Sequence, residues 1–336
     1  MMKLKIIVPA LLGAMALTLT CGACGGGKSN DKQNKPAAVP KDIAVDQQLR
    51  ARLEAFAEGM KLHGVFGFQV YDITANKPVY GYHEHRTQPS ASCLKLLTGV
   101  AGLHFLGTHY NYRTAIFTKG RQVGDTLQGD VSFKADLDPM LQPDDLDMFV
   151  QALRRKGIQN IAGKLIFDLV LTDPVTSEAH WYPWDLSFSH YGLLYKGEAK
   201  VKQALQQSLR HAGIMVSDEQ MVVAKTPAGS HCLFRFYRSI DRVIQRMWKN
   251  SSNTQATSLL YTIGHYYDPK QVPAEAGLAY LHHFMRKNLQ LKDTALVIHD
   301  GCGLCTHNQL SPDALVIILR YGYAHPAIYG QLQRNL

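Results

Sequence analysis

The pattern of hydrophobic and polar positions separates a leader, a tether and a long body. A mostly apolar run at residues 6–19 follows Lys3 and Lys5, and a polar stretch at residues 25–44 comes soon after it. The apolar run is too short to favour a membrane-spanning helix and is typical of a targeting signal. The polar stretch, rich in Gly, Lys, Asn, Gln and Pro, predicts a solvated linker.

The first part of the body predicts a helix followed by a β-hairpin. Apolar residues recur at helical spacing up to residue 60, behind Asp46, which can cap the helix. Apolar positions then alternate with polar or small ones at residues 66–70, and a turn-forming stretch at 74–78 leads to a second strand at 79–82.

Helical patterns dominate the rest of the chain. Each has an apolar face, and several end at Gly or Asn, which favour helix termination. The predicted helices cover residues 92–107, 144–156, 239–249, 255–264, 274–288 and 312–320, and one strand is predicted at 165–168.

Composition indicates a globular protein large enough for two domains. The chain has 336 residues, of which 46% are hydrophobic and 19% charged, a balance that argues against disorder. Its formal net charge of +9 favours an anionic partner. Because no Lys/Arg block is long enough for nucleic acid, we expect a cell wall or membrane surface; the alternative is that the charge serves solubility alone.

Two cysteines stand between the apolar run and the tether. A bacterial lipoprotein signal has the same order of features: an apolar run, a small residue, a Cys and a polar tether. This part of the chain resembles such a signal. Ala23 favours Cys24 as the lipidated residue, Cys21 is the alternative, and an ordinary secretory signal is the alternative interpretation. We therefore expect an exported protein, anchored by lipid to the periplasmic face of a bacterial membrane, where disulfides are permitted.

Three short motifs contain the candidate chemistry. Ser92 and Lys95 lie three residues apart at the start of a predicted helix, so they share a face and can touch. A Ser hydroxyl needs a neighbouring base, and a buried Lys can act as one. A Ser-Ser-Asn triplet follows at 251–253, and Asp-Gly-Cys-Gly-Leu-Cys follows at 300–305.

In this order the motifs resemble those of the low-molecular-weight class C penicillin-binding proteins, the serine D-Ala-D-Ala carboxypeptidases and endopeptidases of peptidoglycan. The resemblance implies that Ser92 attacks the D-Ala-D-Ala carbonyl and forms an acyl-enzyme. It implies that Lys95 takes the Ser92 proton and that Ser251 relays a proton to the leaving amine. The implied substrate-binding residues are Asn253, Asp300, Gly301, Cys302 and Gly303. The implied partners are peptidoglycan stem peptides and, as inhibitors, β-lactams.

The resemblance also implies the fold: a mixed α+β penicillin-binding/β-lactamase-like serine transferase fold with an inserted accessory module. The expected organisation is a signal at 1–24, a linker at 25–44, a main domain at 45–110 and 224–336, and the inserted module at 111–223. Such an insert, and the 300–305 loop, argue against a class C-like β-lactamase. An aromatic cluster around Trp181 and Trp184 matches the family, and we expect these residues to serve packing.

The chain departs from the family pattern in its thiols. Cys302 and Cys305 stand at two family Ser positions, Thr306 at a common Arg, and Ser252 at a usual Asp. Together with His299 and His307, the two cysteines suggest a metal site. No second Cys pair completes the four ligands of a tetrahedral zinc site, so we expect no metal or cofactor. A local disulfide and two buried thiols are the alternatives, and buried thiols are favoured. Cys93 is expected to be buried in helix packing.

The family's Lys-Thr-Gly element has no counterpart after residue 305. Lys225-Thr226-Pro227 precedes Ser251, and its Pro has no N–H to donate. In the family this strand binds the terminal carboxylate and completes the oxyanion hole, and losing one such donor lowers the rate by about 10²–10³. The chain thus resembles a C-terminally truncated member with an incomplete sheet and impaired activity. The alternative is a catalytically inactive penicillin-binding-fold protein that binds cell wall or a partner.

Overall fold

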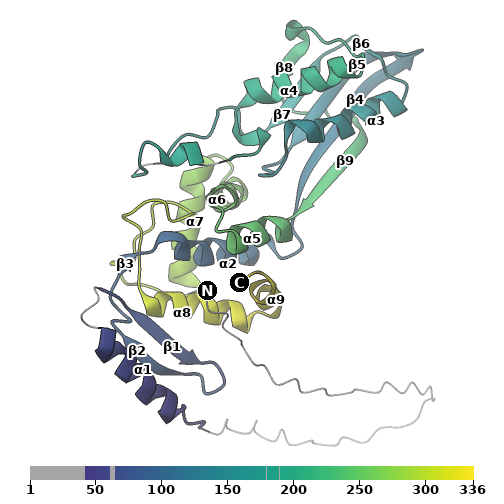
Figure 1. The fold of residues 1–336 in the computed structure, drawn as a ribbon. Helices are drawn as coiled ribbons and strands as arrows, with labels where there is room; N and C mark the ends of the chain where they lie inside the picture. Colours follow the sequence, from purple (N-terminus) through teal and green to yellow (C-terminus); the bar gives the residue numbers. More distant parts are fainter. Residues whose placement is uncertain (1–41, 61–64, 179, 189) are drawn as a thin grey trace, which may run out of the picture. The chain divides into compact units, whose positions relative to one another are not determined.

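The structure is a computed structural model that describes residues 42–60, 65–178, 180–188 and 190–336 (Figure 1). The predicted signal, nearly all of the tether and both candidate lipid sites, Cys21 and Cys24, lie outside the described residues. Residues 43–336 form one unit. Within the described ranges, no helix is long and apolar enough to span a bilayer.

Helix α1 (Gln47–Met60) and the hairpin of β1 (Phe68–Asp72) and β2 (Lys77–Tyr82) confirm the predicted N-terminal elements. The Asp46 carboxylate accepts the backbone N–H groups of Gln48 and Leu49 at 2.9 and 3.0 Å, which is the expected helix cap. Phe56 of α1 packs against the hairpin through Phe68. Within the described residues, neither β1 nor β2 pairs with a third strand.

A layer of helices surrounds α2 (Leu94–Leu106), which begins directly after the short 3₁₀ turn Ala91–Cys93. Helices α5 to α9 all contact α2, and its residues are almost entirely buried for that reason. The predicted apolar face of α5 is confirmed, because its members are buried: Ile240, Val243, Ile244 and Met247. The bounds of the surrounding helices are α5 (Ile240–Lys249), α6 (Asn253–Tyr267), α7 (Pro273–Lys287), α8 (Pro312–Ala324) and α9 (Pro326–Asn335).

Helix α8 connects the hairpin to this layer. The Arg320 guanidinium lies 4.2 Å from the ring centroid of Tyr71 in β1, and it donates to the Asn76 side chain at 2.9 Å. Along the chain, the short strand β3 (Gln88–Pro89) lies between the hairpin and α2, just before Ser92. It pairs with the distant strand β10 (Gln309–Leu310), which fixes the approach of the chain to Ser92. Helix α9 was not predicted.

A separate sheet of six strands follows α2. Its order is β8-β7-β5-β4-β9, with β6 beside β5; β4 is antiparallel to both neighbours, whereas β5, β7 and β8 run parallel. The bounds are β4 (Asn111–Val123), β5 (Thr126–Ala135), β6 (Asn160–Ile161), β7 (Leu165–Leu169), β8 (Met221–Val223) and β9 (His231–Ser239). Only β7 was predicted as a strand.

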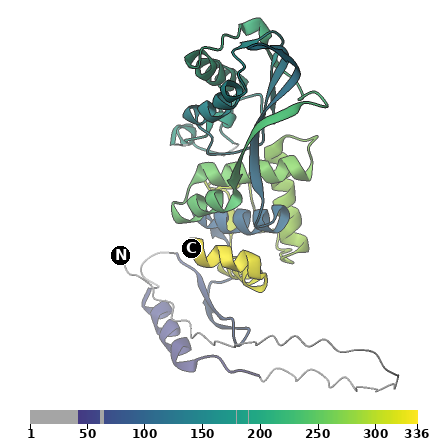
Figure 2. The same cartoon turned by 90° about the vertical axis from the view of Figure 1, so that its right-hand side faces the viewer.

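Helices α3 (Asp147–Arg155) and α4 (Glu198–His211) cover the same face of this sheet, as Figure 2 shows. Their apolar residues share one core with the strands; Phe149 of α3, Leu205 of α4 and Phe133 of β5 are all fully buried. The predicted helix at 144–156 is therefore confirmed as α3 with a preceding 3₁₀ turn at Pro143–Leu146.

The sheet extends past Ala224, where the sequence predicted the chain's return to the main domain. Strand β9 pairs with β4 from Asn111↔Ser239 to Thr118↔His231, so residues 231–239 belong to the same sheet as the predicted insert. The chain leaves the sheet at Ser239 and enters α5 at once. The sequence did not predict this pairing, because strand pairing between segments more than a hundred residues apart leaves no local signal.

A buried ion pair connects β9 to the loop after β5. Asp138 is only 1% exposed, and Arg238 donates its Nε–H to both carboxylate oxygens at 2.8 and 2.9 Å. Burial raises the pKa of Asp138, and the Arg238 charge opposes that rise. Removing one partner of such a pair leaves an uncompensated buried charge.

We predict that Arg238→Met lowers the free energy of unfolding by about 3 kcal/mol, because Asp138 loses its counter-charge. Urea denaturation followed by circular dichroism measures this. The double variant Arg238→Met/Asp138→Asn should recover much of the loss, whereas Arg235→Met, on an exposed position of the same strand, should change stability by less than about 0.5 kcal/mol. Equal urea midpoints for Arg238→Met and the unchanged protein contradict the prediction.

Candidate active site

Ser92 lies in the 3₁₀ turn that precedes α2, and Lys95 lies one turn later on that helix. Ser92 is exposed, whereas Lys95 is 2% exposed. The Lys95 ammonium donates to the Ser92 hydroxyl oxygen at 3.0 Å. The predicted contact between these two side chains is therefore confirmed, and it combines an accessible hydroxyl with a buried amine.

Three acceptors surround the Lys95 ammonium. Besides Ser92, it donates to the Asn253 side-chain oxygen at 2.7 Å and to the Cys302 carbonyl at 2.7 Å. All three of its N–H bonds are thus used. Burial lowers the pKa of Lys95 despite the opposing influence of the thiol of Cys302 and the carboxyl of Asp300. A lysine in this state gives up its proton more readily than one in water and is better suited to act as a base.

Asp300 organises the loop that supplies the Cys302 carbonyl. Its carboxylate is fully buried and accepts five hydrogen bonds. Three come from backbone N–H groups inside the loop, so the carboxylate fixes the loop's path. The donors are the N–H groups of Cys302 (3.0 Å), Gly303 (2.6 Å) and Cys305 (2.7 Å), the side-chain amide of Asn308 (3.1 Å) and the indole of Trp181 (2.9 Å).

Trp181 joins the segment between β7 and α4 to this loop. It is buried, as the packing interpretation expects, but its indole N–H also donates to Asp300. Trp184, by contrast, is 57% exposed and stacks on Tyr182. Only the first of the two tryptophans therefore packs in the interior.

The loop presses directly against the Ser92 turn. Gly303 has a φ of +85°, and a Cβ at this position would lie 1.9 Å from the carbonyl oxygen of Ala91. Thr98 on α2 donates to the Gly301 carbonyl at 2.6 Å and holds the other side of the loop. A glycine is required at 303 both by its backbone conformation and by this approach.

Cys302 and Cys305 are free, buried thiols, so the favoured alternative is confirmed and no disulfide joins them. Burial raises the pKa of both, which keeps them protonated and uncharged. In the described part of the chain, no cluster of three or more His, Cys, Asp or Glu residues can hold a metal ion. Cys93 is exposed, so its predicted burial is wrong: it lies in the 3₁₀ turn, before the buried face of α2 begins at Leu94.

Ser251 departs from the arrangement that the resemblance implies. It is exposed and has a φ of +51°, a left-handed conformation that few residues other than Gly adopt. Within the described residues it makes no hydrogen bond to Ser92 or Lys95. It lines a hollow of about 390 Å³ together with Asn253, so it stands near the site without joining the Lys95 network.

Glu178 lies near Asp300 of the loop, and no motif in the sequence predicts it there. Burial and the nearby Asp300 carboxyl raise the pKa of Glu178 to about 8. Its buried Oε1 has no hydrogen-bond partner within the described residues. A single Glu in a polar stretch carries no signal in one sequence, because its burial follows from contacts with residues over a hundred positions away.

Comparisons with known proteins agree with this geometry. The model of a family described as D-Ala-D-Ala carboxypeptidase 3 (S13) matches residues 49–192 and 194–334. The D-alanyl-D-alanine carboxypeptidase DacB of Haemophilus influenzae is 19% identical over 337 residues, covering 76% of this chain and 70% of its own.

Solved structures show the same fold. The crystal structure of penicillin binding protein 4 (dacB) from Haemophilus influenzae superposes with a TM-score of 0.67 at 18% identity, covering 78% of this chain and 76% of its own. Its complex with a β-lactam gives a TM-score of 0.63 at 18% identity, with 80% and 77% covered. The predicted mixed α+β penicillin-binding fold is thereby confirmed.

We predict that Glu178→Gln becomes progressively more stable than the unchanged protein as the pH rises from about 5 to about 8. Between its ordinary pKa near 4.5 and its folded pKa of about 8, Glu178 binds a proton in the folded state but not in the unfolded state. The folded state therefore loses stability with rising pH across this window, and a neutral Gln does not. Melting temperatures measured at several pH values report the difference.

Glu54→Gln, at an exposed position of α1, is the matched control. The difference between its melting temperature and that of the unchanged protein should not rise from pH 5 to pH 8. A Glu178→Gln difference that stays constant from pH 5 to pH 8.5 contradicts the prediction.

Proposed function

Because the chain belongs to the D-Ala-D-Ala carboxypeptidase 3 (S13) family, we propose that it is a serine D-Ala-D-Ala carboxypeptidase or endopeptidase that acts on peptidoglycan stem peptides through an acyl-enzyme. The observation that carries this proposal is the 3.0 Å contact between the Lys95 ammonium and the exposed Ser92 hydroxyl. An accessible nucleophile beside a buried base is what acyl transfer by a serine needs.

In the proposed reaction, Lys95 in its neutral form takes the proton of the Ser92 hydroxyl while the oxygen attacks the carbonyl of the D-Ala-D-Ala bond. The backbone N–H groups at the start of α2 favour the negative charge that develops on the carbonyl oxygen. The proton held by Lys95 then passes to the leaving amine as the peptide bond breaks, and water hydrolyses the ester to release the acyl group from Ser92. Asn253 uses its side-chain oxygen on Lys95, which leaves its amide N–H groups for the substrate.

We expect acylation to be slow, because Ser251 is not hydrogen-bonded to Ser92 or Lys95 in the described residues and so is not positioned to relay protons. General acid–base groups contribute about 10²–10⁴ in rate when well placed. Two observations favour a second candidate, a penicillin-binding-fold protein that binds cell wall or a partner without catalysis. Ser251 stands outside the Lys95 network, and the hairpin pairs with no third strand among the described residues.

A fluorescent penicillin distinguishes these candidates. We predict weak, covalent labelling that disappears in Ser92→Ala and survives in Cys93→Ala, the matched control for the exposed neighbouring thiol. The labelling rate should rise with pH through a midpoint below the ordinary lysine pKa near 10.5, because burial lowers the pKa of Lys95 and only its neutral form accepts the proton. Gel fluorescence over a pH series measures the rate.

Labelling that persists in Ser92→Ala places the nucleophile elsewhere. A folded protein that takes no label at any pH supports the non-catalytic candidate, and labelling as fast as that of an efficient family member shows that Ser251 matters less than proposed.

The proposed setting is the periplasmic face of a bacterial membrane, with Cys24 as the lipid anchor. We predict that metabolic labelling with a fatty-acid probe marks the protein, that Cys24→Ala abolishes the mark, and that Cys21→Ala retains it, since Ala23 is the small residue preceding the site. The reverse pattern assigns Cys21 instead. Labelling that depends on neither cysteine rules out the lipoprotein signal.

A further inference from the structure

Two hollows adjoin near Asn253, whose side-chain oxygen accepts a hydrogen bond from Lys95. The first, about 390 Å³, is lined by Arg246, Ser251 and Asn253, and the second, about 570 Å³, is lined by Tyr195, Lys196 and Lys200. Gln142 and His190 line both, so the two hollows are neighbours, and together they are called the side cleft. Both volumes fall within the range of about 300–1,000 Å³ that is usual for ligand pockets.

The side cleft shares one residue, Asn253, with the Lys95 network. Asn253 lines its first hollow and also accepts a hydrogen bond from Lys95, which in turn contacts Ser92. Asn253 therefore connects the cleft to the Ser92–Lys95 pair.

The charged residues of the side cleft are all cationic. Arg246 lies in the first hollow, Lys196 and Lys200 lie in the second, and within the described chain no Asp or Glu lines either one. Glu198, two residues after Lys196, pairs with Lys202 at 3.2 Å. Three like charges around a concave surface concentrate a positive potential in it and attract anions.

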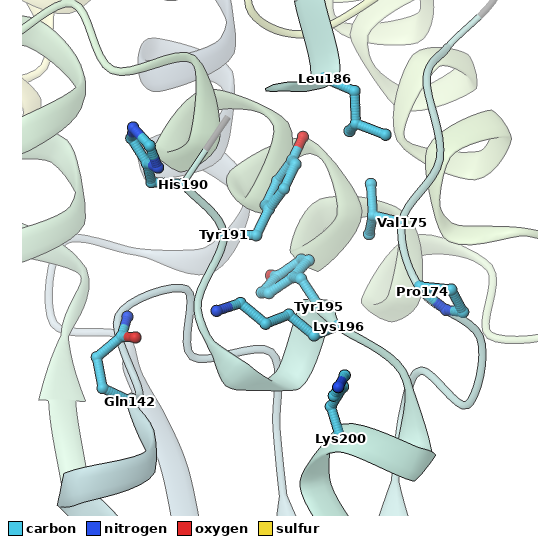
Figure 3. A pocket seen from close by; sticks show the side chains of 9 residues that line it. All are labelled: Gln142, Pro174, Val175, Leu186, His190, Tyr191, Tyr195, Lys196 and Lys200. Carbon is cyan, nitrogen blue, oxygen red and sulfur yellow. The ribbon is translucent and has the colours of Figure 1, made fainter. Parts of the chain in front are cut away.

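The ammonium of Lys196 is available although its backbone is fixed. Lys196 forms a β-bridge with Pro174, and the Val175 N–H donates to the Tyr195 carbonyl at 3.0 Å. The next residue, Gly197, has a φ of +84° and lies so close to Pro174 that a Cβ would stand 3.0 Å from its ring. Figure 3 shows the Lys196 side chain extending toward the side of the pocket where Gln142 lies. It has no ion-pair partner within the described residues.

The other cations are also uncommitted. Lys200 makes only a long contact of 3.5 Å with the Gln203 side chain, and Arg246 has no ion pair in the part of the chain that the structure describes. Tyr191 and Tyr195 stack with ring centroids 5.6 Å apart and supply a flat apolar wall to the second hollow. The cleft thus offers unpaired positive charge beside an apolar surface, which suits a peptide with carboxylate groups.

We propose that the side cleft binds an acidic peptide strand, with Lys196 and Lys200 at one end and Arg246 at the other holding carboxylates that lie outside the scissile bond. The inference rests on the proposed function, since it assigns the strand to the same substrate that Ser92 attacks. It makes these three cations specificity-determining residues: stem peptides with free side carboxylates bind better than peptides in which those groups are amidated.

Binding to the full-length Ser92→Ala protein tests the proposal without turnover. The probes are two fluorescein-labelled pentapeptides ending in D-Ala-D-Ala, one with free carboxylates on its second and third residues and one with both amidated. Fluorescence anisotropy at low salt should show the free peptide binding about tenfold more tightly or better. The ratio should shrink as salt is added, because screening weakens exposed charge pairs.

Charge-removing variants locate the effect. Lys196→Gln and Arg246→Gln, each in the Ser92→Ala background, should lower the ratio by about three- to fivefold, as expected for an exposed charge pair. Lys156→Gln, an exposed lysine at the end of α3 outside the cleft, is the matched control and should leave the ratio unchanged. Since all three side chains are exposed, melting temperatures should agree with that of the parent.

Any of three results overturns the proposal. The first is equal affinity for the two peptides, the second is no measurable binding of the peptide with free carboxylates up to millimolar concentration, and the third is an affinity ratio that is unchanged in both cleft variants. The penicillin experiment separates this failure from failure of the proposed function. Ser92-dependent acylation with a peptide ratio of one refutes only the cleft. A ratio that depends on Lys196 and Arg246 without any acylation supports the cleft and refutes the enzyme.

Discussion

The structure around the candidate site depends on one buried ammonium. Removing a charge from water is costly unless hydrogen bonds replace those it loses, and Lys95 needs three acceptors at once. Its partners come from three segments: Ser92 in the 3₁₀ turn before α2, Asn253 at the start of α6, and the Cys302 carbonyl in the loop. These last two lie 158 and 207 positions from Lys95 in the chain, so satisfying one side chain fixes how distant elements meet.

The loop at 300–305 can accommodate cysteine at positions 302 and 305, where the family resemblance implies serine. Its contacts with the site are made by backbone, since the carbonyls of Cys302 and Gly301 accept from Lys95 and Thr98. The side chains of Cys302 and Cys305 are turned into the protein and remain neutral thiols. Because Asp300 holds the loop through N–H groups, the path of the backbone depends on Asp300 and Gly303 far more than on whether sulfur or oxygen follows them.

Features with a local cause were predictable from sequence. Helical spacing placed Ser92 beside Lys95, and the apolar face of α5 followed from residue order alone. Features that depend on distant pairing were not: β9 joins a strand over a hundred residues earlier, and Glu178 is buried by contacts outside its own segment. The burial of Cys93 was mispredicted for a third reason, because a 3₁₀ turn changes the direction of a side chain without changing the residue pattern. The left-handed backbone of Ser251 leaves no mark in that pattern either.

Trp181 gives the molecule an intrinsic optical reporter. Of the three tryptophans in the chain, Trp181 donates its indole N–H to Asp300 at 2.9 Å and Trp248 donates to the Lys95 carbonyl at 2.9 Å, while Trp184 is solvent-exposed. Indole emission responds to a neighbouring carboxylate and to water, so two of the three fluorophores report on the loop and on the lysine helix separately. Selective quenching of Trp184 by a dissolved quencher leaves a signal that follows the state of the site without any added dye.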